Sequence, residues 1–183
     1  MVSAFNIRKA AHAIKLGGLI AYPTEAVFGL GCDPYQLNAV LRLLKLKSRA
    51  VEKGLILVAS QLEQLSDFIE PLTDEHQQKI LAYPETTWLV PANNAPFWIR
   101  GSHDTVAIRL SAHSLVKELC NTTNQAIVST SANPAGRKPA INSLQSHRYF
   151  HHELDIILSS ETGGHNRPTE IRDLITEKVL RSN

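Results

Sequence analysis

A short apolar run that ends in a polar, glycine-containing segment constrains the fold of this chain most strongly. Residues 18–23 (Gly-Leu-Ile-Ala-Tyr-Pro) predict a buried strand, which the proline ends because it has no N–H to donate to a neighbouring strand. Thr24 and Glu25 follow at once. Gly29 and Gly31 then allow tight turns or the close approach of another group. Strand ends of this kind are where α/β proteins bind ligands. The alternative is a helix that Thr24 caps, although the capping-box position holds no Glu or Gln.

Composition indicates one ordinary globular domain. The 183 residues, 43% hydrophobic and 20% charged, are enough for a full core, so we expect a single domain over residues 1–183. No apolar run reaches the length that spans a bilayer, which excludes a transmembrane helix. Cys32 and Cys120 stand far apart in no metal or redox motif, so free thiols in a reducing cytoplasm are expected. The net charge of +2 does not by itself indicate a nucleic-acid partner.

Hydrophobic periodicity predicts an α/β chain. Helices are expected at residues 3–16, 36–47, 61–69 and 73–82, from 111 or 113 to 121, and within 141–152. Strands are expected at residues 18–23, 54–59, 87–90, 105–109, 125–129, 155–158, 170–174 and 178–181. Because strands and helices do not alternate strictly, we expect a mixed sheet rather than a parallel one. The helix at 36–47 would bury a stripe of four apolar residues, Leu37, Val40, Leu41 and Leu44.

A basic cluster surrounds the end of that helix. Cations favour the negative C-terminal end of a helix, which accounts for Lys45 and leaves the role of Lys47 open. It does not account for Arg49 and Lys53, which lie beyond the helix and just before a buried strand. Cations at the entrance of a strand are typical of a polyphosphate site.

Two later segments carry further candidate site residues. The predicted strand at 125–129 runs into three hydroxyl residues and Asn133, a pattern that suits either anion binding or a turn that closes the strand. In the segment 161–173, Thr169 and Arg172 could face a pocket. Arg172 could instead pair with a neighbouring carboxylate at the surface.

Several common signatures are missing from the sequence. It contains no Walker A loop, no complete dinucleotide fingerprint, no His-Glu-x-x-His motif and no serine elbow. Its eight histidines form no metal-ligand pattern. A nucleotide site would therefore have to be of another type.

Taken in order, these segments resemble the YrdC/TsaC family of threonylcarbamoyl-AMP synthases in its short form. The matching residues are Tyr22–Ala26, Gly29–Gly31, Lys47–Arg49, Lys53–Gly54, Ser129–Asn133, Gly136, Pro168–Asp173 and Leu180–Arg181. The chain departs from the family at residues 83–88, which are shorter and lack a Gly-Pro pair, although Thr87 keeps the place of the family's threonine.

The resemblance implies a fold and an activity. The fold would be a twisted mixed α/β sheet with flanking helices and a concave, positively charged face. The enzyme, a nucleotidyltransferase, would combine L-threonine, bicarbonate and ATP into threonylcarbamoyl-adenylate and release pyrophosphate. Partner proteins would then transfer the threonylcarbamoyl group to an adenosine of tRNA, in the cytoplasm. Whether tRNA or double-stranded RNA also contacts this chain stays open.

The resemblance also assigns roles to residues. Lys47 and Arg49 would be catalytic. Threonine would be bound by Thr24, Thr87, Thr130 and Thr169. ATP would be bound by Lys47, Arg49, Lys53, Ser129, Ser131, Asn133 and Arg181. No protein ligand to a metal is implied, because Mg²⁺ would be held mainly by phosphate oxygens and water.

The alternative function is a non-catalytic RNA-binding factor in tRNA or rRNA maturation. The basic residues between positions 42 and 53 motivate it. An RNA binder would interleave aromatic residues for base stacking with those cations. The chain is only 6% aromatic and that segment contains none, which favours a small-molecule pocket. The enzyme hypothesis requires Thr24, Arg49 and Ser131 to meet around one cavity.

Overall fold

One continuous sheet of nine strands forms the centre of the computed structural model, which describes residues 2–165 and 169–182. In chain order the strands are β1 (Ile20–Pro23), β2 (Phe28–Gly31), β3 (Ile56–Ala59), β4 (Thr87–Pro91), β5 (Thr105–Leu110), β6 (Ile127–Ser131), β7 (Ile156–Ile157), β8 (Ile171–Asp173) and β9 (Val179–Arg181). They lie side by side in the order β7-β1-β2-β6-β3-β5-β4-β8-β9. The pairs β1–β7, β3–β5 and β4–β8 are parallel and the other neighbours antiparallel, so the predicted mixed sheet is confirmed.

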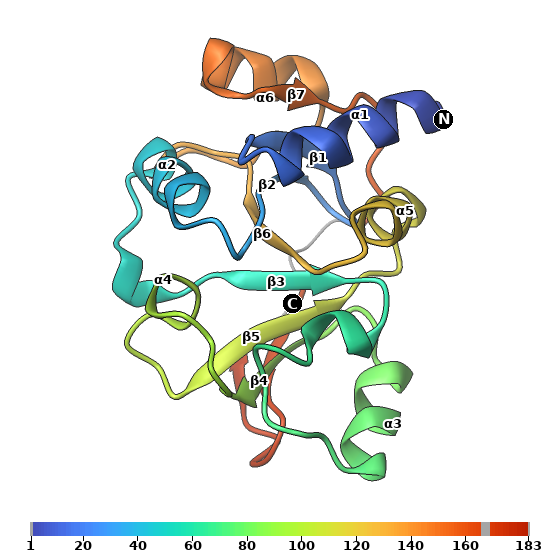
Figure 1. Cartoon of the computed structure of the whole chain (residues 1–183), viewed down its shortest axis with the longest axis vertical. Coiled ribbons are helices and arrows are strands. Elements are labelled where there is room, and N and C mark those ends of the chain that lie inside the picture. Colours follow the sequence, from blue (N-terminus) through green and yellow to red (C-terminus); the bar gives the residue numbers. More distant parts are fainter. Residues whose placement is uncertain (1, 166–168, 183) are drawn as a thin grey trace.

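Helices surround this sheet (Figure 1). They are α1 (Ala4–Lys15), α2 (Leu37–Lys47), η1 (Val51–Lys53), η2 (Leu62–Leu65), α3 (Asp74–Ala82), α4 (Phe97–Arg100), α5 (Ser114–Thr123), α6 (Ser143–Phe150) and η3 (His151–Glu153), where η marks a 3₁₀ turn. The predicted helix at 61–69 is wrong beyond η2. The 3₁₀ turn ends at Leu65, and Ile69 pairs with Ala92 in an isolated antiparallel bridge, which a helix continued to residue 69 could not form. Pro168, part of one family motif, lies outside the described residues.

The segment after β1 forms a second strand, which the sequence analysis did not predict. β1 and β2 form an antiparallel hairpin in which Tyr22 pairs with Gly29, so the alternative of a helix capped by Thr24 is wrong. A Cβ atom at Gly31 would lie 2.8 Å from both Cε1 of Tyr22 and the carbonyl oxygen of Val128. Gly31 therefore serves the close approach of an aromatic ring and a neighbouring strand rather than a turn.

α2 buries a different face from the one predicted. Val40 and Leu44 are buried as expected, but Leu37 and Leu41 are 41% and 45% exposed. Leu43 is buried instead, together with the side chain of Lys47. Periodicity defined the apolar stripe to within about one residue, and packing of α2 against the rest of the core selected the face that is buried.

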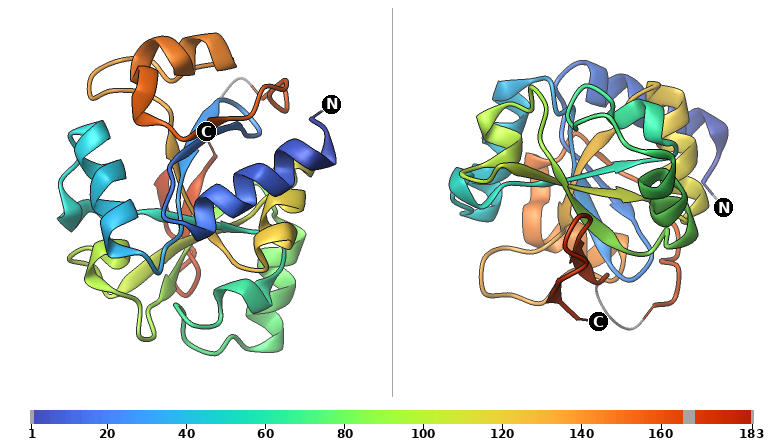
Figure 2. Two further views of the ribbon diagram at one scale, coloured as in Figure 1. Left: turned by 45° about the horizontal axis from the view of Figure 1, so that its top comes forward. Right: turned by 90° about the horizontal axis from the view of Figure 1, so that it is seen from below.

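Two clusters of buried side chains form the core. One joins α1 and α5 to β1, β3 and β6 through residues such as Ile14, Tyr22, Val58, Val116 and Ile127. The larger one packs α2, α3, α4 and α6 against other side chains of the sheet. Figure 2 shows the segment before α6 and the C-terminal strands on one side of the molecule.

Two expectations from composition can be compared with this fold. Both cysteines are buried free thiols, as predicted. None of the helices within residues 2–165 and 169–182 is long and apolar enough to cross a lipid bilayer.

Candidate functional site

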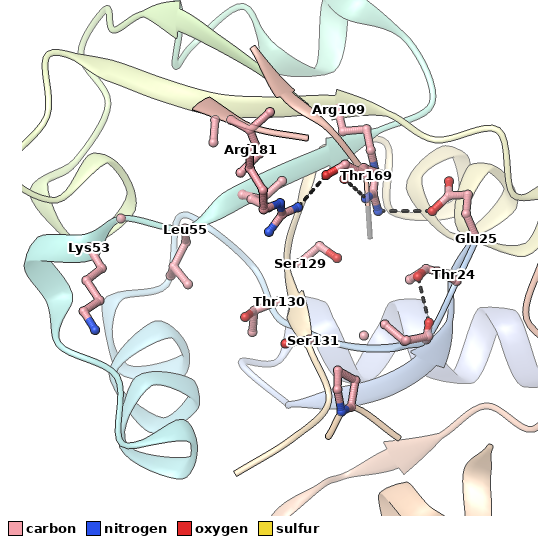
Figure 3. Close-up of a pocket in the computed structure, with 18 of the residues that line it drawn as sticks. Thr24, Glu25, Lys53, Leu55, Arg109, Ser129, Thr130, Ser131, Thr169 and Arg181 are labelled. Carbon is pink, nitrogen blue, oxygen red and sulfur yellow. Dashed lines mark hydrogen bonds and ion pairs between the residues drawn. The ribbon is translucent and has the colours of Figure 1, made fainter. Parts of the chain in front are cut away.

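A cavity of about 1020 Å³ lies against the sheet, with walls from segments far apart in the sequence. Figure 3 shows it with Lys53 at one side and the Glu25–Arg109 pair at the other. Thr24, Arg49 and Ser131 all line it, so the predicted meeting of these residues at one cavity is confirmed. Their binding roles stay predictions.

The floor of the cavity is a row of residues across four strands. Ser129 on β6 pairs with Ile56 on β3, which pairs with Ala107 on β5, which in turn pairs with Leu89 on β4. All four line the cavity. Side chains alternate along a strand, so Val106 and Ile108 turn to the core while Thr105, Ala107 and Arg109 turn to the cavity. The strand period thus selects which β5 residues a ligand can reach.

A buried ion pair closes one side of the cavity. Nη2 of Arg109 lies 3.2 Å from Oε2 of Glu25, and the two side chains are only 10% and 5% exposed. The Ser111 hydroxyl donates to Oε1 of Glu25 at 2.6 Å. Burial raises the pKa of Glu25, but the charge of Arg109 and the Ser111 hydrogen bond outweigh it, so the pKa is lowered below 4.5. Glu25 is therefore a carboxylate at neutral pH.

Thr169 connects this pair to two further residues. Nη1 of Arg109 donates to the Thr169 hydroxyl at 3.2 Å, and the Thr87 hydroxyl lies 3.0 Å from the same oxygen. Nη2 of Arg181 donates to the carbonyl of Thr169 at 2.6 Å. Burial, and then the charge of Arg109, lower the pKa of Arg181. Two guanidinium groups thus share one region of the wall, where an anion would relieve their repulsion.

The opposite side of the cavity carries another set of cations. Arg49 holds the start of β3, because its Nη2 donates to the carbonyl of Gly54 at 2.8 Å. Burial lowers the pKa of Arg49. Lys53 and Arg100 also line the cavity. Among the lining residues that the structure describes, Glu25 is the one carboxylate against five Lys and Arg side chains.

The turn of the β1–β2 hairpin forms a third part of the wall. The Thr24 hydroxyl donates to the carbonyl of Val27 at 2.7 Å, so its oxygen is left to accept from a ligand. The N–H groups of Gly163 and His165 donate to the carbonyls of Thr24 and Glu25 at 2.9 and 3.0 Å. A Cβ at Gly163 would lie 2.9 Å from the carbonyl oxygen of Glu25, so glycine permits this contact. The hairpin turn is therefore held in place by the C-terminal segment.

The residues predicted for the site divide into two groups. Eight of them line the cavity: Thr24, Arg49, Lys53, Ser129, Thr130, Ser131, Thr169 and Arg181. Lys47, Thr87 and Asn133 are not among the described lining residues. Each is hydrogen-bonded to one that is, Lys47 and Asn133 to Ser131 and Thr87 to Thr169. Arg172 pairs with Glu170 instead of facing the cavity, as one of the two alternatives proposed.

Two residues of the wall, Arg109 and Glu25, were not predicted as site residues. Arg109 could have been found from the alternation in residues 105–109, which sets it on the face opposite to Val106 and Ile108. Glu25 comes just after the predicted buried strand at 18–23. That position indicated a ligand site at the strand end, but it did not indicate which residue would pair with the carboxylate. Which cation would meet this carboxylate depended on the tertiary fold.

The described residues offer no metal cage. No group of three or more His, Cys, Asp or Glu side chains within residues 2–165 and 169–182 is arranged to hold a metal ion. Glu25 is already engaged by Arg109 and Ser111. A divalent cation at this cavity would need oxygen ligands from the bound molecule itself.

The Sua5/YciO/YrdC family model, described as telomere recombination, matches residues 12–183. The chain is 50% identical over 184 residues to the threonylcarbamoyl-AMP synthase of Pseudomonas aeruginosa (strain UCBPP-PA14), with 99% of each chain covered. It is 48% identical to that of Pseudomonas entomophila, again over 99% of each chain.

Solved structures show the same architecture. P. abyssi Sua5 complexed with L-threonine matches with a TM-score of 0.89 at 30% identity. The alignment covers 99% of this chain but 55% of that one, so the present chain spans about half of Sua5. E. coli YciO matches with a TM-score of 0.82 at 20% identity, covering 96% of this chain and 88% of that one, a likeness of fold alone.

Proposed function

This chain belongs to the Sua5/YciO/YrdC family, and from that premise we propose that it is an L-threonylcarbamoyladenylate synthase. It forms threonylcarbamoyl-AMP and pyrophosphate from L-threonine, bicarbonate and ATP, and is thus a transferase that serves tRNA modification. The likeness to curated threonylcarbamoyl-AMP synthases over the full length supports this function over that of a non-catalytic RNA-binding factor.

The geometric observation that carries the proposal is one cavity with two chemically different sides. Arg49 and Lys53 stand at one side, and at the other a buried Glu25–Arg109 pair lies beside Thr169. The side with Arg49 and Lys53 suits a chain of phosphates, because it offers positive charge. The side with the Glu25–Arg109 pair suits a small zwitterion, because it offers charges of both signs. The volume of about 1020 Å³ leaves room for a nucleotide and an amino acid together.

Threonine occupies the side next to Arg109 in this proposal. Its carboxylate meets the guanidinium of Arg109, and its hydroxyl meets the oxygens of Thr24 or Thr169, which line the same region. Thr87 acts through its hydrogen bond to Thr169, because its own side chain is fully buried. Thr130 completes the set of predicted threonine-binding residues.

ATP extends from this region toward Arg49 and Lys53, with Ser129, Ser131 and Arg181 along its length. Threonine and bicarbonate condense with loss of water to a carbamate. A carbamate oxygen then bonds to the α-phosphorus as the bond to the departing pyrophosphate breaks. Positioning and neutralisation of charge are the main needs of such a transfer, so Arg49 contributes electrostatically and no nucleophilic side chain is required.

Water exclusion is a second contribution of the cavity. A carbamate of threonine is labile in water. The apolar side chains of Ile56, Ala107 and Leu89 on the cavity floor keep water away from it until it reacts. Mg²⁺ would be held mainly by the phosphate oxygens of ATP, whose charge it would neutralise, since the one carboxylate of the described wall is already paired. Transfer of the product to tRNA by partner proteins in the cytoplasm belongs to the same proposal.

Pyrophosphate release tests the function directly. The purified chain is incubated with ATP, Mg²⁺ and bicarbonate, with L-threonine, L-serine or no amino acid. We expect release with L-threonine and a product that carries both adenylate and threonine by mass spectrometry. Release that does not depend on threonine, or none at all, would contradict the proposal. Tight RNA binding in place of turnover, falling steeply with salt, would favour the RNA-binding alternative.

A further inference from the structure

The ammonium group of Lys47 is directed at the end of β6 and at Asn133. Its Nζ donates to the carbonyl of Ser131, to the carbonyl of Asn133 at 3.0 Å and to Oδ1 of Asn133 at 3.3 Å. An ammonium group has three N–H donors, so all three are engaged. Lys47 is 7% exposed and is not among the described lining residues. To reach a phosphate it would have to give up these three hydrogen bonds, which is unfavourable in a buried position.

The side-chain amide of Asn133 has a defined orientation. Its Nδ2 donates to the carbonyl of Pro134 at 3.1 Å and to that of Arg137 at 2.9 Å. Both of these are acceptors, so the nitrogen must face them and Oδ1 must face Lys47. Oδ1 is then an acceptor held between the charge of Lys47 and the hydroxyl of Ser131.

The Ser131 hydroxyl donates its proton to this acceptor. Its Oγ lies 2.6 Å from Oδ1 of Asn133, which has no proton to give in return. The lone pairs of Oγ are therefore what Ser131 offers to the cavity that it lines. A phosphate oxygen carries no proton at neutral pH and is a poor partner for it. An O–H or N–H group of a ligand is a good one.

We propose that Lys47 is a positioning residue which, through Asn133, fixes the Ser131 hydroxyl as a hydrogen-bond acceptor for an O–H or N–H group of the ATP nucleoside. Lys47 itself does not bind phosphate, and that task belongs to Arg49 and Lys53, which do line the cavity. The inference rests on the proposed function, since it takes ATP to be the ligand. The donor is a ribose hydroxyl or the adenine amino group, and both provide the same chemistry.

Nucleotide binding measured by calorimetry separates this role from phosphate binding. ATP, ADP and AMP are titrated into the wild type and into Lys47→Met, Ser131→Ala, the double variant and Lys45→Met. Lys45, an exposed lysine on the same helix, is the matched control. We expect Lys47→Met and Ser131→Ala each to weaken all three nucleotides by a similar factor, roughly three- to tenfold. The double variant should be little weaker than either single variant.

Several outcomes would overturn the proposal. A loss in Lys47→Met that grows from AMP to ATP would show that Lys47 contacts the phosphates. A Ser131→Ala variant that binds nucleotides normally but has a raised KM for threonine would assign the acceptor to the amino acid. A wild type that neither binds ATP nor releases pyrophosphate would instead refute the proposed function, which is a different result.

Nucleotide analogues identify the donor and do not depend on the folding of the Lys47 variant. The wild type and Ser131→Ala are titrated with 2′-deoxy-ATP, 3′-deoxy-ATP and purine riboside triphosphate, which lacks the amino group. We expect the wild type to bind one analogue more weakly than ATP, by about the factor that Ser131→Ala loses with ATP. Ser131→Ala should no longer distinguish that analogue from ATP. If both proteins discriminate equally among all of the analogues, Ser131 accepts no bond from the nucleoside and the proposal is wrong.

Discussion

Glu25 and Arg109 are 84 positions apart in the sequence and meet at 3.2 Å in the cavity wall. Glu25 comes from the turn between β1 and β2, whereas Arg109 comes from β5. The pair therefore joins the two halves of the sheet that enclose the cavity. Because both side chains are almost fully buried, removal of one partner leaves the other without compensation.

The charge of Glu25 predicts a pH-dependent term in stability. Its pKa is lowered below 4.5, so its contribution is present above that pH and is lost as the pH falls through the folded-state value. We expect Glu25→Gln to cost about 2 kcal/mol of unfolding free energy at pH 7 and distinctly less at pH 4. Urea unfolding at both values checks this, with the exposed Glu153→Gln as control. If Glu25→Gln lost the same unfolding free energy at pH 7 and at pH 4, the ion pair of Glu25 with Arg109 would be contradicted.

The buried ammonium group of Lys47 predicts a second pH-dependent contribution to stability, this time in alkaline solution. Burial, and then the charge of Arg49, lower its pKa from 10.5 to about 8. The folded chain thus releases this proton at lower pH than the unfolded chain, and unfolding free energy rises with pH between these values. Between pH 7.5 and 9.5 we expect the wild type to gain about 2 kcal/mol relative to Lys47→Met. Identical pH slopes in urea unfolding would show that Lys47 titrates normally.

Arg49 should be essential for catalysis in the proposed reaction. We expect Arg49→Ala to lose about 2–4 kcal/mol of transition-state stabilisation in kcat/KM for pyrophosphate release, because the developing charge loses one of the cations of the cavity wall. Lys45→Ala is the control on the same basic segment. Since Arg49 also holds Gly54, thermal unfolding of the variant is measured alongside. Turnover of a folded Arg49→Ala at the wild-type rate would remove Arg49 from the site.

Replacement of Thr169 should weaken the binding of threonine and leave the binding of ATP unchanged. Its hydroxyl contacts both Arg109 and Thr87 at the side of the cavity assigned to the amino acid. We expect Thr169→Val, which keeps the shape, to raise the KM for threonine about tenfold and to leave the Kd for ATP unchanged. Thr122→Val on α5 is the control, since its hydroxyl bonds only within the helix. An effect on ATP alone would reverse the assignment of the two sides.

Gly31 should tolerate no side chain. A Cβ there would lie 2.8 Å from the ring of Tyr22 and from a backbone carbonyl, neither of which can move freely. We expect Gly31→Ala to cost about 3 kcal/mol of unfolding free energy. Gly136 is the comparison, since it has φ of +76° but nothing within 4 Å, so Gly136→Ala should cost only about 1 kcal/mol. Equal costs in the two variants would contradict the close packing of Tyr22.

Local patterns in the sequence determined most of the framework. The apolar run at 18–23, the alternation at 105–109 and the amphipathic segment at 3–16 each contain enough information to define a strand or a helix. These features depend on residues close together in the chain, so that periodicity and turn chemistry reveal them. That the loops around Thr24, Arg49, Ser131 and Thr169 would meet was instead implied by the resemblance of the ordered segments to the YrdC/TsaC family.

The tertiary structure decided what depended on distant partners. Phe28–Gly31 is a strand because β1 and β6 flank it, although its two glycines disfavour strand structure locally. Packing against the core sets the rotation of α2 about its axis and so buries Lys47. The three N–H donors of Lys47 then bond to Ser131 and Asn133, which are more than 80 positions away. A buried charge must find partners wherever the fold supplies them, and no local pattern records which residues these will be.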